Sequence, residues 1–215
     1  MNKLSFVGVL CTVVLAVLST TANAAFMGRL ETSPGSGVFQ AYYDDLLNIT
    51  WTTNANINGT DSWANQLAWA AGLSIDGVAG WRLPSMDVNG DNTIVNCVTA
   101  SQADCMDNEY GHLFNYGKDT TKGNGIVPGI STVPFTMVQS DIYWSGTARD
   151  AFNTWTYRFD SGSNLSVSTE GNPRFAWAVR AGDVSEVPVP AAAWLFGTGL
   201  IGLIGMARRK KKQPK

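Results

Sequence analysis

The feature that most constrains this chain is its C-terminal segment, Val187–Lys215. A Pro-Val-Pro element at 188–190 precedes an uncharged apolar run, Ala191–Ala207, which ends against five consecutive basic residues, Arg208–Lys212. At about 1.5 Å rise per residue, a helix over the apolar run would be roughly 25 Å long, close to the thickness of a bilayer core. Because a basic cluster beside such a helix stays in the cytoplasm, the preceding residues are expected to lie outside the membrane.

The order of these parts resembles a PEP-CTERM sorting signal, in the variant that carries a VPLPA motif. The motif here consists of Val187, Pro188, Val189, Pro190 and Ala191. The resemblance implies that an exosortase-type membrane protease cuts near the motif, so that the inner-membrane anchor is transient and the domain is released or re-anchored. A permanent membrane anchor with a cytoplasmic C-terminus is the alternative interpretation.

The N-terminus predicts export through the Sec translocon. Lys3 supplies a positive charge, Leu4–Leu18 is an almost uninterrupted apolar stretch, and Ala22 and Ala24 form an A-x-A cleavage site. These are the three parts of a secretory signal peptide, which we place at residues 1–24. Cell-surface or extracellular localisation follows from the two signals together.

Between the two signals lie residues 25–186, a length at which one domain can bury a hydrophobic core. All 17 acidic residues of the chain fall here, together with eight of its 15 basic residues, which gives a formal net charge of −9. Such a surface repels nucleic acid and other polyanions but attracts cations. Seven of the eight tryptophans also fall here, and this composition is common in extracellular β-rich and carbohydrate-binding domains.

The hydrophobic pattern predicts an α+β fold, with an antiparallel sheet that is apolar on one face and with one or two helices. A helix is expected over Asp61–Ala71, with Thr60 or Asp61 as its N-cap and Gly72 as its stop. Alternation and aromatic content predict strands at Val38–Tyr43, Asn48–Thr53, Asp141–Thr147, Thr154–Asp160, Asn164–Ser168 and 174–180. The same alternation places Trp144, Trp155 and Trp177 mostly in the core.

Several short motifs follow one another in a recognisable order. The strongest are Trp81-Arg82-Leu83-Pro84, Tyr143-Trp144-Ser145 and Val179-Arg180. Together they resemble the Lcl C-terminal domain family, named after an adhesin, over roughly residues 38–183. The resemblance implies a C-type-lectin-like fold, structural roles for these motif residues, and a surface or extracellular role that includes glycan binding in that adhesin.

The stretch 87–93 is the best candidate for a ligand site. Oxygen donors stand at relative positions 1, 3 and 5, with a backbone carbonyl at position 7, as in the first half of an EF-hand calcium loop: Asp87, Asn89, Asp91 and Thr93. Asn92 replaces the usual glycine, and Val98 stands where a bidentate acid belongs, so Asp104 or Asp107 would have to complete the shell. The alternative is a turn that is held by its own side-chain hydrogen bonds.

Cys97 and Cys105 are the two cysteines that remain after removal of the signal peptide. In an exported protein such a pair predicts a disulfide. A metal site that also used His112 would have a spacing that is not typical of zinc.

No motif predicts catalysis, and no catalytic residue is assigned. His112 is the sole histidine, no serine stands in a G-x-S-x-G motif, and Glu109 is one of many acids that could form an acid–base pair. We therefore expect a non-enzyme that requires no cofactor, with calcium as the one candidate. Three hypotheses remain: a glycan- or matrix-binding adhesion module of an exopolysaccharide biofilm, a structural surface protein, or a cryptic hydrolase. Exposed aromatic residues beside Asp87–Asp91 would favour the first.

Overall fold

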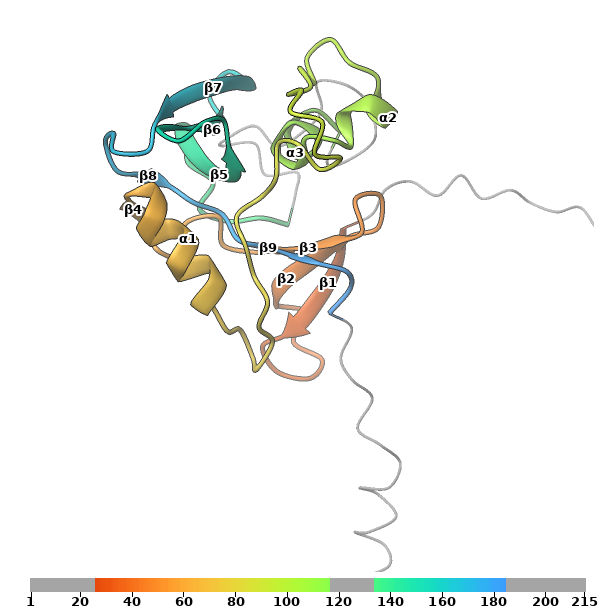
Figure 1. Ribbon diagram of the computed structural model, residues 1–215. Coiled ribbons are helices and arrows are strands. Elements are labelled where there is room, and N and C mark those ends of the chain that lie inside the picture. Colours follow the sequence, from red (N-terminus) through yellow and green to blue (C-terminus); the bar gives the residue numbers. More distant parts are fainter. Residues whose placement is uncertain (1–25, 117–133, 185–215) are drawn as a thin grey trace, which may run out of the picture.

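Two sheets and three helices organise the residues that the computed structural model describes, 26–116 and 134–184 (Figure 1). The predicted signal peptide at 1–24 and the predicted sorting signal at 187–215 lie outside the described residues. Within the described part, no helix is long and apolar enough to cross a bilayer. The α+β class predicted from the sequence is confirmed.

The first sheet has the order β1-β2-β3-β9, and every neighbouring pair in it is antiparallel. Its strands are β1 (Phe26–Glu31), β2 (Phe39–Asp44), β3 (Ile49–Thr52) and β9 (Val179–Ala181). All four residues of β3 are buried, because this strand lies between β2 and β9 and is covered on both faces. The strands predicted at 38–43 and 48–53 are confirmed as β2 and β3.

The second sheet has the order β4-β8-β5-β6-β7. Its strands are β4 (Thr60–Asp61), β8 (Arg174–Phe175), β5 (Ile142–Ala148), β6 (Asn153–Arg158) and β7 (Ser163–Ser168). The pairing is antiparallel except between β5 and β8, which run parallel. The predicted hairpins of β5, β6 and β7 are confirmed, whereas the expectation of a single antiparallel sheet is wrong.

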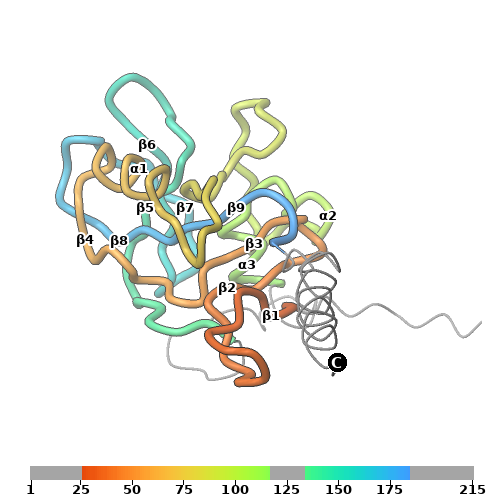
Figure 2. Tube along the Cα trace, turned by 90° about the horizontal axis from the view of Figure 1, so that it is seen from below, coloured from red at the N-terminus to blue at the C-terminus, as the bar shows by residue number. Residues whose placement is uncertain are grey.

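The segment 174–181 explains this difference. Its alternating pattern predicts one strand, but the chain pairs with β5 at Phe175, leaves that sheet, and joins β3 from Val179 onward. Ala176, Trp177 and Ala178 link the two strands and are all buried. Figure 2 shows this blue segment running from β8 to β9. A buried crossing between sheets has the same composition as a buried strand, so hydrophobic periodicity cannot distinguish them.

Helix α1 (Trp63–Gly72) begins at Ser62, whose hydroxyl accepts a hydrogen bond from the backbone N–H of Asn65. The cap is therefore neither Thr60 nor Asp61, which form β4 instead. Gly72 is the last helical residue, close to the predicted stop. Two further helices, α2 (Gln102–Cys105) and α3 (Glu109–Tyr116), lie in a stretch for which the sequence pattern predicted no element.

The second sheet is covered on both faces. On one face Trp144 packs with Ala70 of α1 and Leu83, and its indole N–H donates to the carbonyl of Asp61. On the other face Tyr143 and Tyr157 pack with Tyr110 of α3. The prediction of one apolar face was therefore wrong.

The polar face that the alternation predicted for β6 consists of threonines that are buried. Thr154 and Thr156 donate hydrogen bonds from their hydroxyls to the carbonyls of Thr147 and Leu165. A hydroxyl whose hydrogen bond is satisfied inside a sheet can be buried at little cost. Threonine therefore looks polar in the sequence pattern but is compatible with a core position.

Candidate functional site

The three motif segments meet in the interior. Arg82 and Val179 exchange two backbone hydrogen bonds of 2.8 and 2.9 Å, which join the 81–84 segment to the start of β9. The backbone N–H of Gly146 in β5 donates to the carbonyl of Pro84 at 2.8 Å. A Cβ added at Gly146 would lie 3.2 Å from the carbonyl oxygen of Leu83, so the two segments are in close contact.

The polar atoms of these motif residues are mostly used within the fold. The indole N–H of Trp81 donates to the carbonyl of Val78, the hydroxyl of Ser145 donates to the carbonyl of Trp155, and the Arg180 guanidinium donates to the carbonyl of Ala79. Trp81, Leu83, Tyr143 and Trp144 are buried. These contacts indicate that the motif residues stabilise the fold.

Arg82 forms the strongest polar contact of the motif, with Glu109 at the start of α3. Its two terminal nitrogens donate to the two carboxylate oxygens at 2.7 and 2.6 Å. The same carboxylate accepts a 2.6 Å hydrogen bond from the backbone N–H of Ser85. Burial tends to lower the pKa of Arg82, but the hydrogen bonds that its guanidinium donates to the Glu109 carboxylate, together with the negative charge of Glu109, outweigh burial and raise that pKa. Because both of its oxygens are engaged, Glu109 is not a free acid for catalysis.

The 87–93 loop wraps around the carboxylate of Asp87. Its Oδ1 accepts hydrogen bonds from the backbone N–H groups of Gly90 and Asp91, and its Oδ2 accepts one from Asn92. Asn89 and Asp91 accept in the same way from the N–H groups two residues further on, at 2.8 and 2.7 Å. These are the turn contacts of the alternative interpretation.

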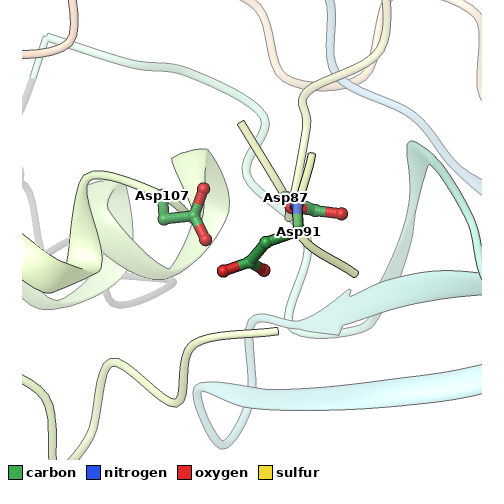
Figure 3. A group of neighbouring side chains, drawn as sticks. All are labelled: Asp87, Asp91 and Asp107. Carbon is green, nitrogen blue, oxygen red and sulfur yellow. The ribbon is translucent and has the colours of Figure 1, made fainter. Parts of the chain in front are cut away.

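The fold nevertheless brings three carboxylates together at this loop. One oxygen from each of Asp87, Asp91 and Asp107 lies within 4.8 Å of the other two. Figure 3 shows the three side chains together, with Asp107 coming from the segment before α3. Asp107 also accepts a 2.8 Å hydrogen bond from the backbone N–H of Asn89, which joins its segment to the loop. Each carboxylate oxygen has two acceptor positions. Oδ1 of Asp87 uses both for backbone N–H groups, whereas Oδ2 of Asp87 and the carboxylates of Asp91 and Asp107 keep positions that a cation could take.

Two departures from the calcium-loop pattern are compensated in the fold. Asn92, in place of glycine, has a φ of 64°, the left-handed conformation that glycine adopts easily and asparagine tolerates. Asp107 supplies the distant carboxylate that Val98 cannot provide. Asp104, the other acid considered, instead accepts a hydrogen bond from the hydroxyl of Ser101 at 2.6 Å. Asp87, Asn89, Asp91, Thr93 and Asp107 are thus the residues that could hold calcium.

The predicted disulfide between Cys97 and Cys105 is present, with a Cα–Cα distance of 5.2 Å. Both cysteines are buried with Tyr116 of α3. A Cβ added at Gly111 would lie 2.5 Å from the Sγ of Cys97, so the bridge packs directly on α3. Because Asp107 follows Cys105 by two residues, the disulfide helps to hold this carboxylate beside the loop.

His112 is buried in α3, with 1% of its surface exposed. Among residues 26–116 and 134–184, neither ring nitrogen has a hydrogen-bond partner. Burial lowers its pKa from 6.5 to about 4. Its ring lies 5.6 Å from that of Tyr116. A serine–histidine–acid arrangement requires hydrogen bonds on both nitrogens, and His112 makes neither with the part of the chain that the structure describes.

The aromatic residues do not gather at the acidic loop. Trp144 and Trp177 are fully buried, as predicted, and Trp155 is half-buried beneath the guanidinium of Arg149. Among the described residues, Phe152 is the one aromatic side chain that is largely exposed, at 76%. It lies between β5 and β6, whereas the exposed apolar residue of the loop itself is Val88.

A groove that the sequence did not predict lies beside the start of β2 in the first sheet. Residues at the start of β2, after β3 and after α1 enclose about 500 Å³. No pattern in the sequence indicates this groove, because its three lining segments are separate in the sequence and come together only in the folded chain.

The described residues thus form an α+β domain with a disulfide and an acidic loop. A model of the Lcl C-terminal domain matches residues 40–180. The protein belongs to this family, as its motifs suggested, and membership indicates a surface or extracellular domain. No curated protein matches the chain.

Proposed function

We propose that this protein is an exported, non-catalytic surface module that binds extracellular polysaccharide and whose 87–93 loop is organised by calcium. The fold in this proposal is C-type-lectin-like, as the family resemblance implies. The Sec translocon and an exosortase-type protease are its partners during export and sorting. The observation that carries the proposal is the cluster of Asp87, Asp91 and Asp107 in a domain of this family.

The cluster supports calcium for an electrostatic reason. Ionised carboxylates within 4.8 Å of one another repel, and a bound cation removes that repulsion. Oxygen donors in a flexible loop suit Ca²⁺, which takes six to eight oxygen ligands at about 2.3–2.6 Å. Open coordination positions on such an ion can also be filled by sugar hydroxyls, and this would make glycan binding depend on calcium.

The first test is a calcium titration followed by calorimetry and thermal unfolding. We expect Asp91→Asn to weaken calcium binding by about tenfold or more, because it removes one charged ligand. Asp104→Asn is the matched control, since Asp104 is outside the cluster and should leave calcium affinity unchanged. In the unmodified protein, free calcium at about 100 times its Kd should add about 2.7 kcal/mol to the free energy of unfolding. Equal melting temperatures with calcium and with EDTA would contradict the metal site.

The second test is a glycan and exopolysaccharide array, with calcium and again with EDTA. Binding that EDTA removes is the expected result. Binding that EDTA leaves intact would retain the glycan module and discard the role of calcium.

A structural surface protein without a ligand is the second candidate. The burial of Trp144 and Trp177 favours it, because these rings are not available to stack on sugars. Absence of binding to every glycan in both conditions would support this second function.

A further inference from the structure

The groove at the end of the first sheet has the construction of a small-ligand site. Its volume of about 500 Å³ falls in the range of roughly 300–1,000 Å³ that such sites occupy. It is separate from the acidic loop, since no residue of 87–93 or Asp107 lines it. Three segments form it: the start of β2, the residues after β3 and the residues after α1.

One part of the lining is apolar. It is provided by Phe39, Ile57, Leu73 and Ile75. Ile57 is 40% exposed, and the other three are half-buried, so this apolar surface is in contact with solvent. A sugar ring offers C–H groups on its face, and these can cover such a surface.

The other part of the lining carries polar groups that remain available. Within residues 26–116 and 134–184, the side chains of Gln40, Ser74 and Asp76 form no hydrogen bond or ion pair. The amide oxygen of Asn54 accepts from the backbone of Asn56, which leaves its NH₂ group available. The groove therefore presents amide donors and acceptors, a hydroxyl and a carboxylate beside an apolar surface, as recognition of a polyhydroxylated ring requires.

The backbone at Asp76 has a defined turn conformation. Ile75 and Val78 exchange two backbone hydrogen bonds, of 3.0 and 2.9 Å. Between them Asp76 and Gly77 have φ values of 53° and 79°, as expected for a two-residue type I′ turn. The turn holds the backbone of its two residues in one conformation, so a ligand would have to order the Asp76 side chain but not the loop that carries it.

The one charge in the lining of the groove is negative. Asp76 is the one charged residue in its lining, and Glu31 lies across the β1–β2 pair from Phe39. Hydrogen bonds from the backbone N–H groups of Gly37 and Gly35 lower the pKa of Glu31, so it is ionised at neutral pH. With 17 acidic and eight basic residues in 25–186, the long-range field also attracts cations. The carboxylate of Asp76 therefore favours a cationic ligand over an anionic one in this groove.

We propose that this groove binds a glycan with free amino groups, such as a glucosamine polymer, through the carboxylate of Asp76. The ammonium group pairs with Asp76, ring hydroxyls bond to Gln40 and Ser74, and the C–H face of the sugar lies on Ile57 and Ile75. This inference rests on the proposed glycan-binding function and adds the ligand class and a second site to it.

The test compares a glucosamine hexasaccharide with its fully N-acetylated counterpart, titrated into the full-length protein in mild detergent. We expect the amine form to bind at least about tenfold more tightly, since a charge-assisted hydrogen bond is stronger than a neutral one. Asp76→Asn should remove this preference, and asparagine keeps the φ > 0 that the turn requires. Asp45→Asn is the matched control: it removes the same charge from an exposed residue that follows the opposite end of β2.

The outcomes separate the two proposals. Equal affinity for the two hexasaccharides, or a preference that survives in Asp76→Asn, would overturn the groove as an amino-sugar site. If other glycans still bind in a calcium-dependent manner, the proposed function stands without the groove. Binding of no glycan at all would overturn both. Gln40→Ala supplies an independent check, because it should weaken binding of both hexasaccharides.

Discussion

Arg82 and Glu109 show how one residue pair connects distant parts of the chain. The carboxylate is 3% exposed, whereas 41% of the Arg82 side chain is accessible to water. Removal of the guanidinium would leave a buried, uncompensated negative charge, and this is the costly way to break such a pair. Removal of both partners costs less, because no charge remains buried.

We therefore expect Arg82→Met to lower the free energy of unfolding by about 3 kcal/mol, the lower end of the range for buried pairs because water partly screens the exposed guanidinium. The double variant Arg82→Met/Glu109→Leu should recover a large part of this loss. Urea unfolding of the two single variants and the double variant measures the coupling. Additive effects of the two substitutions would show that the ion pair is not coupled.

At the scale of elements, the disulfide joins the 97–105 segment to α3 and to the acidic loop. The chain-entropy model gives about 2–3 kcal/mol for closing so short a loop. We expect Cys97→Ala/Cys105→Ala to lose about this much stability. Calcium affinity should also fall, because Asp107 follows the bridge and is less well held without it.

Urea unfolding and calcium titration of the oxidised protein and of the double variant measure the two effects. Ser101→Ala is a useful comparison, since it removes the cap of α2 without opening the loop. A double variant with lower stability but unchanged calcium affinity would show that the bridge does not position Asp107.

Local patterns predicted some elements well. β2, β3 and the hairpins of β5 to β7 are formed by residues that are close in sequence, and α1 has its cap, periodicity and stop within a dozen positions. The helices α2 and α3 were missed because each is short, and their stability comes from the disulfide and from contacts with distant aromatic rings.

The candidate site could also be predicted from the sequence only in part. The oxygen spacing from Asp87 to Thr93 identified the loop, and the sequence limited the distant acid to Asp104 or Asp107. Only the distances between carboxylate oxygens in the folded chain identify Asp107 as the acid that lies beside Asp87 and Asp91. The Asp76 groove carries no sequence signal, since its lining comes from three separate segments.

At the scale of the whole molecule, two buried groups give the stability opposite dependences on pH. Burial raises the pKa of Asp44 from 3.8 to about 6, despite hydrogen bonds from the backbone N–H groups of Leu47 and Leu46. Burial also lowers the pKa of His112 from 6.5 to about 4. In both cases the protein interior disfavours the charged form.

The folded state binds the Asp44 proton more tightly than the unfolded chain does. The contribution of Asp44 to the free energy of unfolding is therefore fully present below pH 3.8 and is lost as the pH rises through about 6. For His112 the unfolded chain binds the proton more tightly, so its contribution is full above pH 6.5 and is lost as the pH falls toward about 4. Each effect amounts to about 3 kcal/mol, and between pH 4 and 6.5 their slopes have opposite signs.

We expect the unmodified protein to change little in stability over this window, because the two effects nearly cancel. Asp44→Asn removes the effect of Asp44 and retains that of His112. The free energy of unfolding of this variant should therefore fall by about 3 kcal/mol between pH 7 and pH 4. His112→Phe should show the reverse slope, with lower stability at pH 7 than at pH 4.5. This variant loses no hydrogen bond within the described residues, since neither ring nitrogen of His112 has a partner there. Urea unfolding at pH 4.5, 5.5 and 7 measures the slopes. If both variants kept the flat profile of the unmodified protein, neither group would titrate differently in the folded and unfolded states, and their burial would carry no pH-dependent cost.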